Sequence, residues 1–362
     1  MSRQKLMLFL LLSLTLPAAG FEGVPLRSGQ KIFASGMNLA WIHFGRDLID
    51  FDEARFTQAL DEIAAAGGNT VRWWLHVNGS ASPTFTDGLV SGLQPQEIPN
   101  LLRALDLAYE RGLLLLPVLW SFDMLQKQQG VDLDRNRRLL EDRSCTQAYL
   151  EHALIPMLKA AAGHPALLAW EICNEPEGMT PKFGWSAERV EVRTVQQFHN
   201  LLAGAVHRTD PRALVTTGCW NVQVVSGRPE FENWYSDAAL IAAGGDSLGV
   251  LDFYQVHYYP RWYDEAYSPF HHPAAYWQLD KPVLIGEFPA KGLAGKDQGG
   301  RLQAALSTEN AYRFAFENSY LGCLAWTWTG HDGLGGLKDA APGMRLLREI
   351  ASKAVILKMA EP

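Results

Sequence analysis

The sequence has few cysteines, and none of them lie at the short spacing of a zinc-binding pair. Four are present in 362 residues, and they are far apart: Cys145, Cys173, Cys219 and Cys323. This spacing gives no support to a zinc site. Two interpretations of the four side chains stay open: a disulfide, if the protein matures in an oxidising compartment, and buried free thiols, which suit Cys173 and Cys323 on predicted strands.

The apolar segment near the N-terminus is too short to span a bilayer. It covers residues 6–16, follows Arg3 and Lys5, and is followed by small residues at 17–20 that suit cleavage. This pattern predicts a secretory signal peptide over residues 1–20. We expect a mature chain of residues 21–362 that is secreted or periplasmic and has no membrane anchor after cleavage.

The sequence also has fewer basic than acidic residues. The chain has 32 lysines and arginines against 39 aspartates and glutamates. The predicted signal peptide removes two basic residues and no acidic ones, so the mature chain has a net charge of −9. This charge argues against partners such as nucleic acid or an anionic membrane surface, and it leaves neutral substrates open.

Strand and helix patterns alternate along the rest of the chain. Strands are expected at residues 32–38, 69–75, 113–120, 167–175, 213–220, 250–259, 282–288 and 321–328, and helices after them at residues 51–66, 95–111, 146–162, 188–207, 237–243, 273–278, 301–319 and 344–356. Such alternation implies parallel pairing, and eight units at this length close most simply into an α/β fold, a single-domain (β/α)8 TIM barrel. A doubly wound open sheet is the alternative, but no Gly-rich phosphate loop follows the first strand.

Two of the predicted strands end in a glutamate with a proline close behind it. One carries Asn174 and Glu175, and the other carries Glu287. Barrel enzymes place their active sites at the carboxyl ends of the strands, so we expect both carboxylates to face one cavity. Glu171 and Glu177 are rival carboxylates: the first lies deeper in an apolar run, and the second lies beyond the turn.

The other strand ends and the loop after the first strand carry further polar and aromatic residues: Trp41, Arg72, Trp120, Trp220, His257, Tyr259, Trp326 and Trp328. Two carboxylates among neutral polar groups and flat indole faces are the residues that cleavage of a glycosidic bond requires: an acid, a nucleophile and apolar surfaces for the sugar rings. Glu175, in apolar surroundings, is the candidate acid and then base. Arg72 and Tyr259 would hold Glu287 ionised and lower its pKa.

Purely structural roles remain open for several of these residues. Arg72 could form a structural ion pair at the barrel mouth, and His257 could be a satisfied histidine at a strand end. For Trp326 and Trp328 the alternative is packing in the barrel or against a helix, and at least one of them is expected in the core.

The two glutamate motifs, in their order along the chain, resemble glycoside hydrolase family 5 and, more broadly, the retaining glycosidases of clan A. The resemblance is carried by Asn174-Glu175-Pro176 after a Trp-containing apolar strand and by Ile285-Gly286-Glu287-Phe288. It implies that Glu175 is the acid/base and Glu287 the nucleophile, and that no metal or other cofactor is needed. It also implies that the sugar is bound by, or lies close to, Arg72, Asn174, His257, Tyr259 and Trp326.

One departure from the family pattern affects the expected substrate. Cellulase-like members carry a histidine at the end of the third strand, where this chain has Trp120. Together with residues 168–171 and 257–262, this tryptophan looks more like the mannanase branches. Trp120 and Trp41 are therefore added to the candidate sugar contacts.

We predict a secreted, monomeric, retaining endo-β-1,4-mannanase that acts on β-linked polysaccharide or oligosaccharide. A β-1,4-glucanase, an exo-β-mannosidase and a non-catalytic carbohydrate-binding barrel are the alternatives. Two opposed carboxylates argue against the binding protein, which has no need of them. A metal-dependent barrel hydrolase is disfavoured because the first strand lacks a His-x-His pair.

Overall fold

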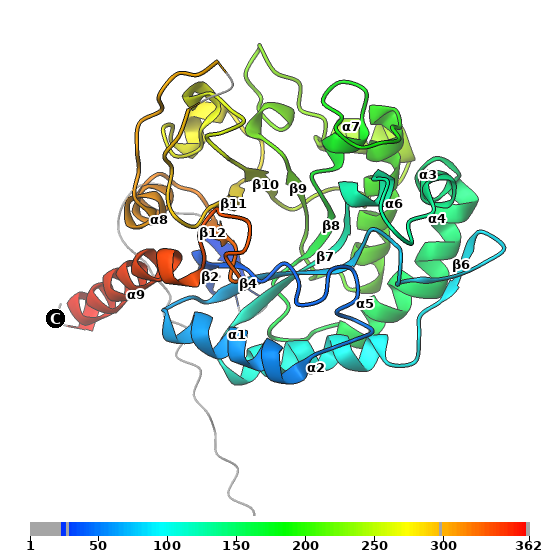
Figure 1. The fold of residues 1–362 in the computed structure, drawn as a ribbon, viewed down its shortest axis with the longest axis horizontal. Helices are drawn as coiled ribbons and strands as arrows, with labels where there is room; N and C mark the ends of the chain where they lie inside the picture. The colour runs from blue at the N-terminus through cyan, green and yellow to red at the C-terminus, as the bar shows by residue number, and fades with distance from the viewer. Residues whose placement is uncertain (1–22, 27–28, 297–298, 360–362) are drawn as a thin grey trace, which may run out of the picture.

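The computed structural model describes residues 23–26, 29–296 and 299–359. The predicted signal peptide lies outside the described residues. The centre of the molecule is a closed barrel of parallel strands, so the (β/α)8 prediction is confirmed (Figure 1). Its strands, in chain order and also in order around the barrel, are β3 (Ala34–Asn38), β4 (Thr70–Val77), β7 (Leu114–Ser121), β8 (Trp170–Asn174), β9 (Val215–Cys219), β10 (Tyr254–His257), β11 (Val283–Pro289) and β12 (Gly322–Trp326).

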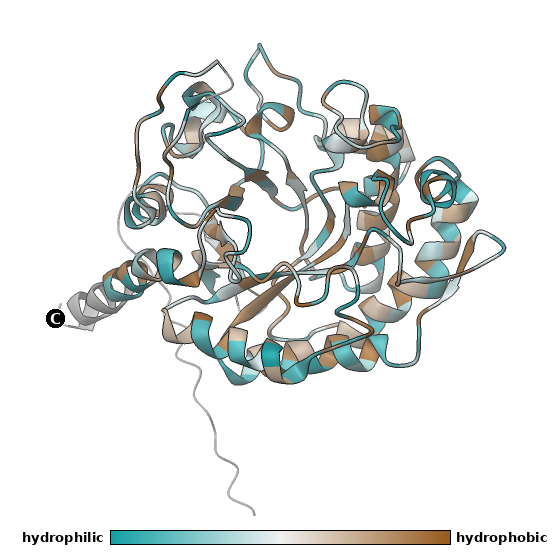
Figure 2. Ribbon diagram, in the orientation of Figure 1, coloured by the Kyte–Doolittle hydropathy of each residue, from teal (hydrophilic) through white to brown (hydrophobic). Residues whose placement is uncertain are grey.

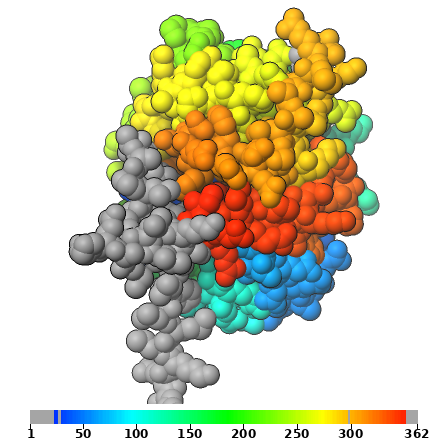
Figure 3. Space-filling view, turned by 90° about the vertical axis from the view of Figure 1, so that its left-hand side faces the viewer, coloured from blue at the N-terminus to red at the C-terminus, as the bar shows by residue number. Residues whose placement is uncertain are grey.

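Helices surround the barrel, and Figure 2 shows mainly hydrophobic strands at the centre with hydrophilic residues on the outer helices. The α-helices are α1 (Glu53–Ala65), α2 (Glu97–Glu110), α3 (Leu133–Glu141), α4 (Arg143–Tyr149), α5 (Ile155–Ala161), α6 (Val192–Thr209), α7 (Asp237–Gly244), α8 (Thr308–Glu317) and α9 (Leu337–Met359). The helix α9 packs beside α8 and α1, as Figure 3 also shows. Among the described residues, no helix combines the length and apolar character needed to cross a bilayer.

The prediction of a helix at residues 273–278 is wrong. This segment forms a single 3-10 turn, Ala274–Trp277, after another at Glu265–Tyr267. Only eight residues separate Pro273 from Pro282, and a proline disfavours helical backbone in the residue before it. The strand before this segment is also shorter than the expected 250–259.

The connection between β7 and β8 holds more structure than the sequence predicts. A 3-10 turn (Phe122–Leu125) and α3 precede the expected helix, and that helix is interrupted by a π-turn at Leu150–Leu154. Asp132 begins α3 by accepting a hydrogen bond from the Arg135 N–H at 3.0 Å. A hairpin of β5 (Thr84–Thr86) and β6 (Leu89–Gly92) was also not predicted.

Apolar side chains fill the barrel interior at one end, and a cavity lined partly by polar residues lies at the other. A short hairpin, β1 (Val24–Pro25) and β2 (Lys31–Ile32), places Val24 against the interior side chains Leu116, Leu284 and Leu324. All four cysteines are buried free thiols, so the disulfide alternative does not hold. The catalytic candidates lie at the opposite end of the strands.

Candidate active site

The backbone at the end of β8 turns Glu175 out of the strand. Asn174 is the last strand residue, and Glu175 adopts left-handed φ and ψ of 45° and 51° before a 3-10 turn at Pro176–Met179. Its N–H still donates to the carbonyl oxygen of Gly218 on β9, at 2.6 Å. This conformation is uncommon for a residue with a side chain, and such strain gathers at functional sites.

Glu287 lies on β11 and is held at both carboxylate oxygens. Arg72 Nη1 donates to Oε1 at 2.5 Å, and the Tyr259 hydroxyl donates to Oε2 at 2.6 Å. The prediction that Arg72 and Tyr259 are the partners of Glu287 is confirmed. These two bonds fix the direction in which the carboxylate points.

Arg72 is the centre of a buried polar cluster beneath the cavity. Its Nε and Nη2 donate to the two oxygens of Glu171, at 2.7 and 2.5 Å, so this rival carboxylate is the partner of a structural ion pair. Nη1 and Nη2 also donate to the side-chain oxygens of Asn38 and Asn174, at 2.9 and 2.8 Å. Since Arg72 is fully buried, it cannot touch a sugar and acts by positioning the residues above it.

Gly218 on β9 leaves the space that this ion pair needs. A Cβ at that position would lie 2.4 Å from Glu171 Oε1 and 2.9 Å from Arg72 Nη2. Any larger residue would therefore displace the guanidinium that holds Glu287. The glycine is required by close approach rather than by backbone conformation.

His257 lies between the two candidate carboxylates. Its Nδ1 is 2.9 Å from Glu175 Oε1 and 3.6 Å from Glu287 Oε2. Burial lowers the pKa of His257 to about 4, so the ring is neutral near pH 7. Like Arg72, it is fully buried and supports the carboxylates instead of contacting substrate.

One carboxylate oxygen each from Glu175 and Glu287 and one ring nitrogen of His257 lie within 4.8 Å of one another, close enough to bind a metal ion as ligands. However, both oxygens of Glu287 already accept hydrogen bonds from protein groups. A pair of carboxylates supported by a neutral histidine is better suited to proton transfer and nucleophilic attack.

Burial dominates the ionisation of both carboxyl groups. It raises the pKa of Glu175 to about 7; Arg72 opposes this rise, and Asp123 and Glu171 add to it. Burial also raises the pKa of Glu287. His257, Arg72 and Tyr259 offset part of this rise, but the pKa stays above its usual value. The expectation of a lowered pKa for Glu287 is therefore wrong in direction. The two residues still differ: Glu287 accepts two hydrogen bonds that favour its charged form, whereas the one side-chain partner of Glu175 among the described residues is a neutral imidazole.

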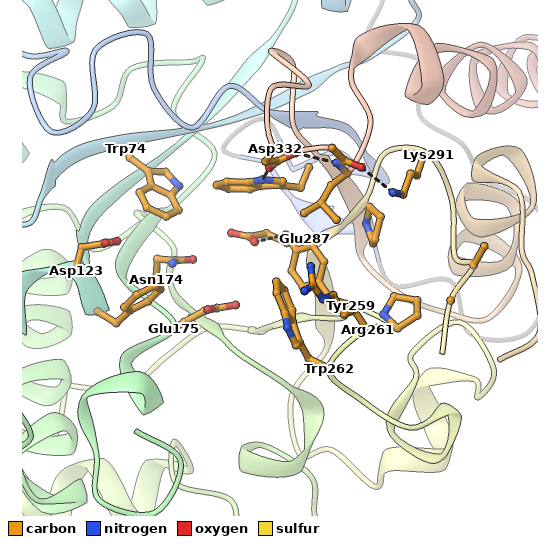
Figure 4. A pocket seen from close by; sticks show the side chains of 18 of the residues that line it. Trp74, Asp123, Asn174, Glu175, Tyr259, Arg261, Trp262, Glu287, Lys291 and Asp332 are labelled. Carbon is orange, nitrogen blue, oxygen red and sulfur yellow. Dashed lines mark hydrogen bonds between the residues drawn. The ribbon is translucent and has the colours of Figure 1, made fainter. Parts of the chain in front are cut away.

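Both carboxylates point into one cavity of about 640 Å³, shown in Figure 4. Three indoles form one wall: the ring centroid of Trp74 is 5.2 Å from Trp41 and 5.7 Å from Trp326. The Trp326 N–H donates to Asp332 Oδ2 at 2.5 Å, which fixes its ring. Tyr259, Trp262, Asn174 and Asp123 also line the cavity.

The structure brings most of the predicted site residues together, but not all. Trp41, Asn174, Tyr259 and Trp326 line the cavity with the two glutamates. The prediction that Trp120 contacts the sugar is wrong. Its ring is fully buried, with its centroid 5.1 Å from that of His76 and 5.3 Å from that of Tyr149, and it does not line the cavity. Trp328 lies outside as well, where its N–H donates to Glu62.

Sequence reasoning missed Trp74, Asp123 and Asp332. Trp74 had a signal, because it is two residues beyond Arg72 and side chains at that spacing share a strand face. Asp123 lies in the turn after β7 and accepts from Ser121 Oγ at 2.6 Å and from Gln128 Nε2 at 2.9 Å. Nothing in the sequence pattern distinguishes Asp332 from other loop aspartates.

Comparisons with known proteins agree on one family. The family described as Cellulase (glycosyl hydrolase family 5) matches residues 27–332. A mannan endo-1,4-beta-mannosidase of Mytilus edulis is 34% identical over an alignment of 330 residues, and the match covers 84% of this chain and 85% of the relative. Another from Cryptopygus antarcticus is 32% identical over an alignment of 349 residues, and the match covers 88% of this chain and 87% of that relative. The crystal structure of an endo-1,4-beta-mannanase from Eisenia fetida superposes with a TM-score of 0.78 at 33% identity, over 91% of this chain and 94% of that one.

Proposed function

Because the chain belongs to glycosyl hydrolase family 5, we propose that this glycoside hydrolase is an exported, retaining endo-β-1,4-mannanase. Export is supported by the pattern of residues 1–20, and the substrate by the names of the relatives from Mytilus and Cryptopygus. The mechanism is supported by the site itself.

One observation carries the retaining mechanism. An oxygen of Glu175 and an oxygen of Glu287 lie within 4.8 Å of each other. Retaining glycosidases hold their two carboxyl groups about 5–5.5 Å apart, whereas inverting enzymes leave roughly 6.5–9.5 Å for a water molecule. The spacing favours direct attack by a carboxylate on the sugar.

In the first step of the proposed reaction, Glu287 attacks the anomeric carbon while Glu175 gives its proton to the glycosidic oxygen. The bond to the leaving sugar breaks, and the other sugar is left as an ester on Glu287. In the second step, Glu175 takes a proton from water, the resulting hydroxide attacks the anomeric carbon, and Glu287 is released. A pKa near 7 suits Glu175 to both the acid and the base role.

The neighbouring residues prepare this pair. Arg72 and Tyr259 orient Glu287 for attack through hydrogen bonds to both of its oxygens. Asn174 lines the cavity beside Glu175 and is held by Arg72, so it can donate its amide to a sugar hydroxyl. Trp326 and Trp74 supply flat apolar faces for the ring C–H groups.

A β-1,4-glucanase is the second candidate, because the family description is Cellulase. The two are separated by assaying the mature protein on galactomannan, glucomannan and carboxymethyl cellulose, with Glu175→Ala and Glu287→Ala as inactive controls. We expect short manno-oligosaccharides from wild type and none from either variant. Activity on carboxymethyl cellulose alone would refute the mannanase assignment and keep the two glutamates.

A further inference from the structure

A second cavity, of about 640 Å³, lies outside the catalytic cleft. Its walls come from the segments that follow β8, β9 and β10, which are neighbours in the barrel (Figure 1). The aromatic residues Phe183, Phe231, Trp234 and Tyr267 line it together with polar groups. None of these residues belongs to the catalytic machinery described above.

A continuous line of aromatic rings joins the two cavities. Phe122 lines the catalytic cleft, and its ring centroid is 5.4 Å from that of Trp185, which is 38% exposed. Trp185 lies 6.0 Å from Trp220, and Trp220 lies 4.7 Å from Phe183. Phe183 in turn lies 5.4 Å from Trp234 in the second cavity.

The second cavity is connected to the acid side of the catalytic pair. The segment after β8 carries both Glu175 and, a few residues later, Phe183. The buried Glu177 ties this segment to the next one: it accepts hydrogen bonds from the backbone N–H of Trp220 at 3.0 Å and from the Tyr235 hydroxyl at 2.5 Å. Glu175, which would protonate the leaving sugar, and one wall of the cavity therefore belong to the same segment.

The polar lining suits a neutral, hydroxyl-rich ligand. The exposed Lys182 faces Glu232 at 4.0 Å, and Arg228 at the edge pairs with Glu230 at 2.6 Å, so the charges are balanced in pairs. The side-chain amide of Gln223 lines the cavity and has no hydrogen-bond partner within the described part of the chain. Aromatic rings beside amide and carboxylate groups match the C–H faces and hydroxyls of pyranose sugars.

We propose that this second cavity binds a remote stretch of the same β-linked polysaccharide, on the leaving-group side of the cleavage point. This inference rests on the proposed function. The less buried rings of this line, Phe122, Trp185 and Phe183, give the polymer a path of contacts from the cleft to the second cavity. Only substrates long enough to extend from the cleft to this cavity gain from it.

The test compares a long and a short substrate. Phe231→Ala removes a half-buried ring at the cavity wall, and Gln223→Ala removes the unpartnered amide with little risk to folding. Tyr109→Ala on α2 is the matched control, because Tyr109 is 39% exposed and lines neither cavity. KM and kcat are measured on galactomannan and on mannotriose, with melting temperatures to confirm folding.

We expect KM on galactomannan to rise about three- to tenfold in both cavity variants, the effect of losing one aromatic or polar contact. Their kinetics on mannotriose, and those of Tyr109→Ala on both substrates, should stay within twofold of wild type. Unchanged KM on galactomannan, or equal losses on both substrates, would overturn the second site and leave the proposed function intact. A wild-type protein with no activity on galactomannan would overturn the proposed function and this inference with it.

Discussion

Replacing Glu171 by glutamine separates the structural carboxylate from the catalytic pair. Arg72 donates two hydrogen bonds to Glu171, and neither side chain is exposed. Glutamine keeps the size of the side chain but not its charge, so Arg72 retains Glu287 as its one acidic partner within the described residues. Removing one member of a buried ion pair costs roughly 3–5 kcal/mol of stability. We expect the free energy of unfolding to fall by about this amount.

The expected loss of activity in this variant is small by comparison. Because Glu171 does not reach the cavity, kcat of the folded Glu171→Gln protein should fall by no more than about tenfold, or about 1.4 kcal/mol in the barrier. Glu175→Gln should lose about 10²–10⁴-fold in kcat and little stability, since it removes the proposed general acid.

Urea unfolding followed by tryptophan fluorescence and initial rates on galactomannan measure the two effects. Glu53→Gln is the matched control: it breaks an exposed ion pair with Arg103 and should change the free energy of unfolding far less than Glu171→Gln does. The reasoning is refuted if Glu171→Gln is as stable as wild type. It is equally refuted if the folded variant is as inactive as Glu175→Gln.

Four further predictions follow from the site. Tyr259→Phe removes a 2.6 Å hydrogen bond to Glu287. Because a hydrogen bond to a charged group is worth about 1.5–3 kcal/mol, kcat should fall about 10- to 100-fold. Steady-state kinetics test this prediction, and an unchanged kcat would contradict it. Because the acid must carry its proton, kcat should fall as the pH rises through about 7, the pKa of Glu175, and a rate that is flat to pH 9 would exclude this role. Glu177 has its pKa raised from 4.5 to about 7 by burial, so the folded state binds more protons than the unfolded state between these values; the unfolding free energy should decrease from pH 4.5 to 7 in urea titrations, and Glu177→Gln should weaken that slope. Trp74→Ala should raise KM on mannan about three- to tenfold by removing one indole of the cavity wall, whereas equal KM values would place the sugar elsewhere.

The candidate active site was predictable because the carboxyl ends of the strands in a parallel barrel meet at one end of it. Glu175 and Glu287 are more than 100 residues apart in the chain, yet each follows an apolar strand, and the closed barrel brings both strand ends to one cavity. Arg72 and Tyr259 were found by the same rule. Glu171 could be given its role only when its distance to Arg72 was known.

The errors arise where local irregularity breaks the strand rule. The pairing of β4 with β7 shifts between Trp74 and Val77, and Ser121 takes the inward position near the end of β7, so the indole of Trp120 packs outward. The pKa direction of Glu287 was wrong because burial cannot be read from neighbouring residue types. The second cavity is equally invisible in the sequence, since its walls come from three separate connections.

The most direct test of the mechanism is the configuration of the first sugar product. Proton NMR spectra are recorded during the first minutes of manno-oligosaccharide hydrolysis, before the anomers equilibrate. Double displacement by Glu287 and Glu175 predicts that the β-anomer forms first and the α-anomer appears later by mutarotation. If the α-anomer forms first, water attacks the sugar directly, and the assignment of Glu287 as nucleophile is wrong.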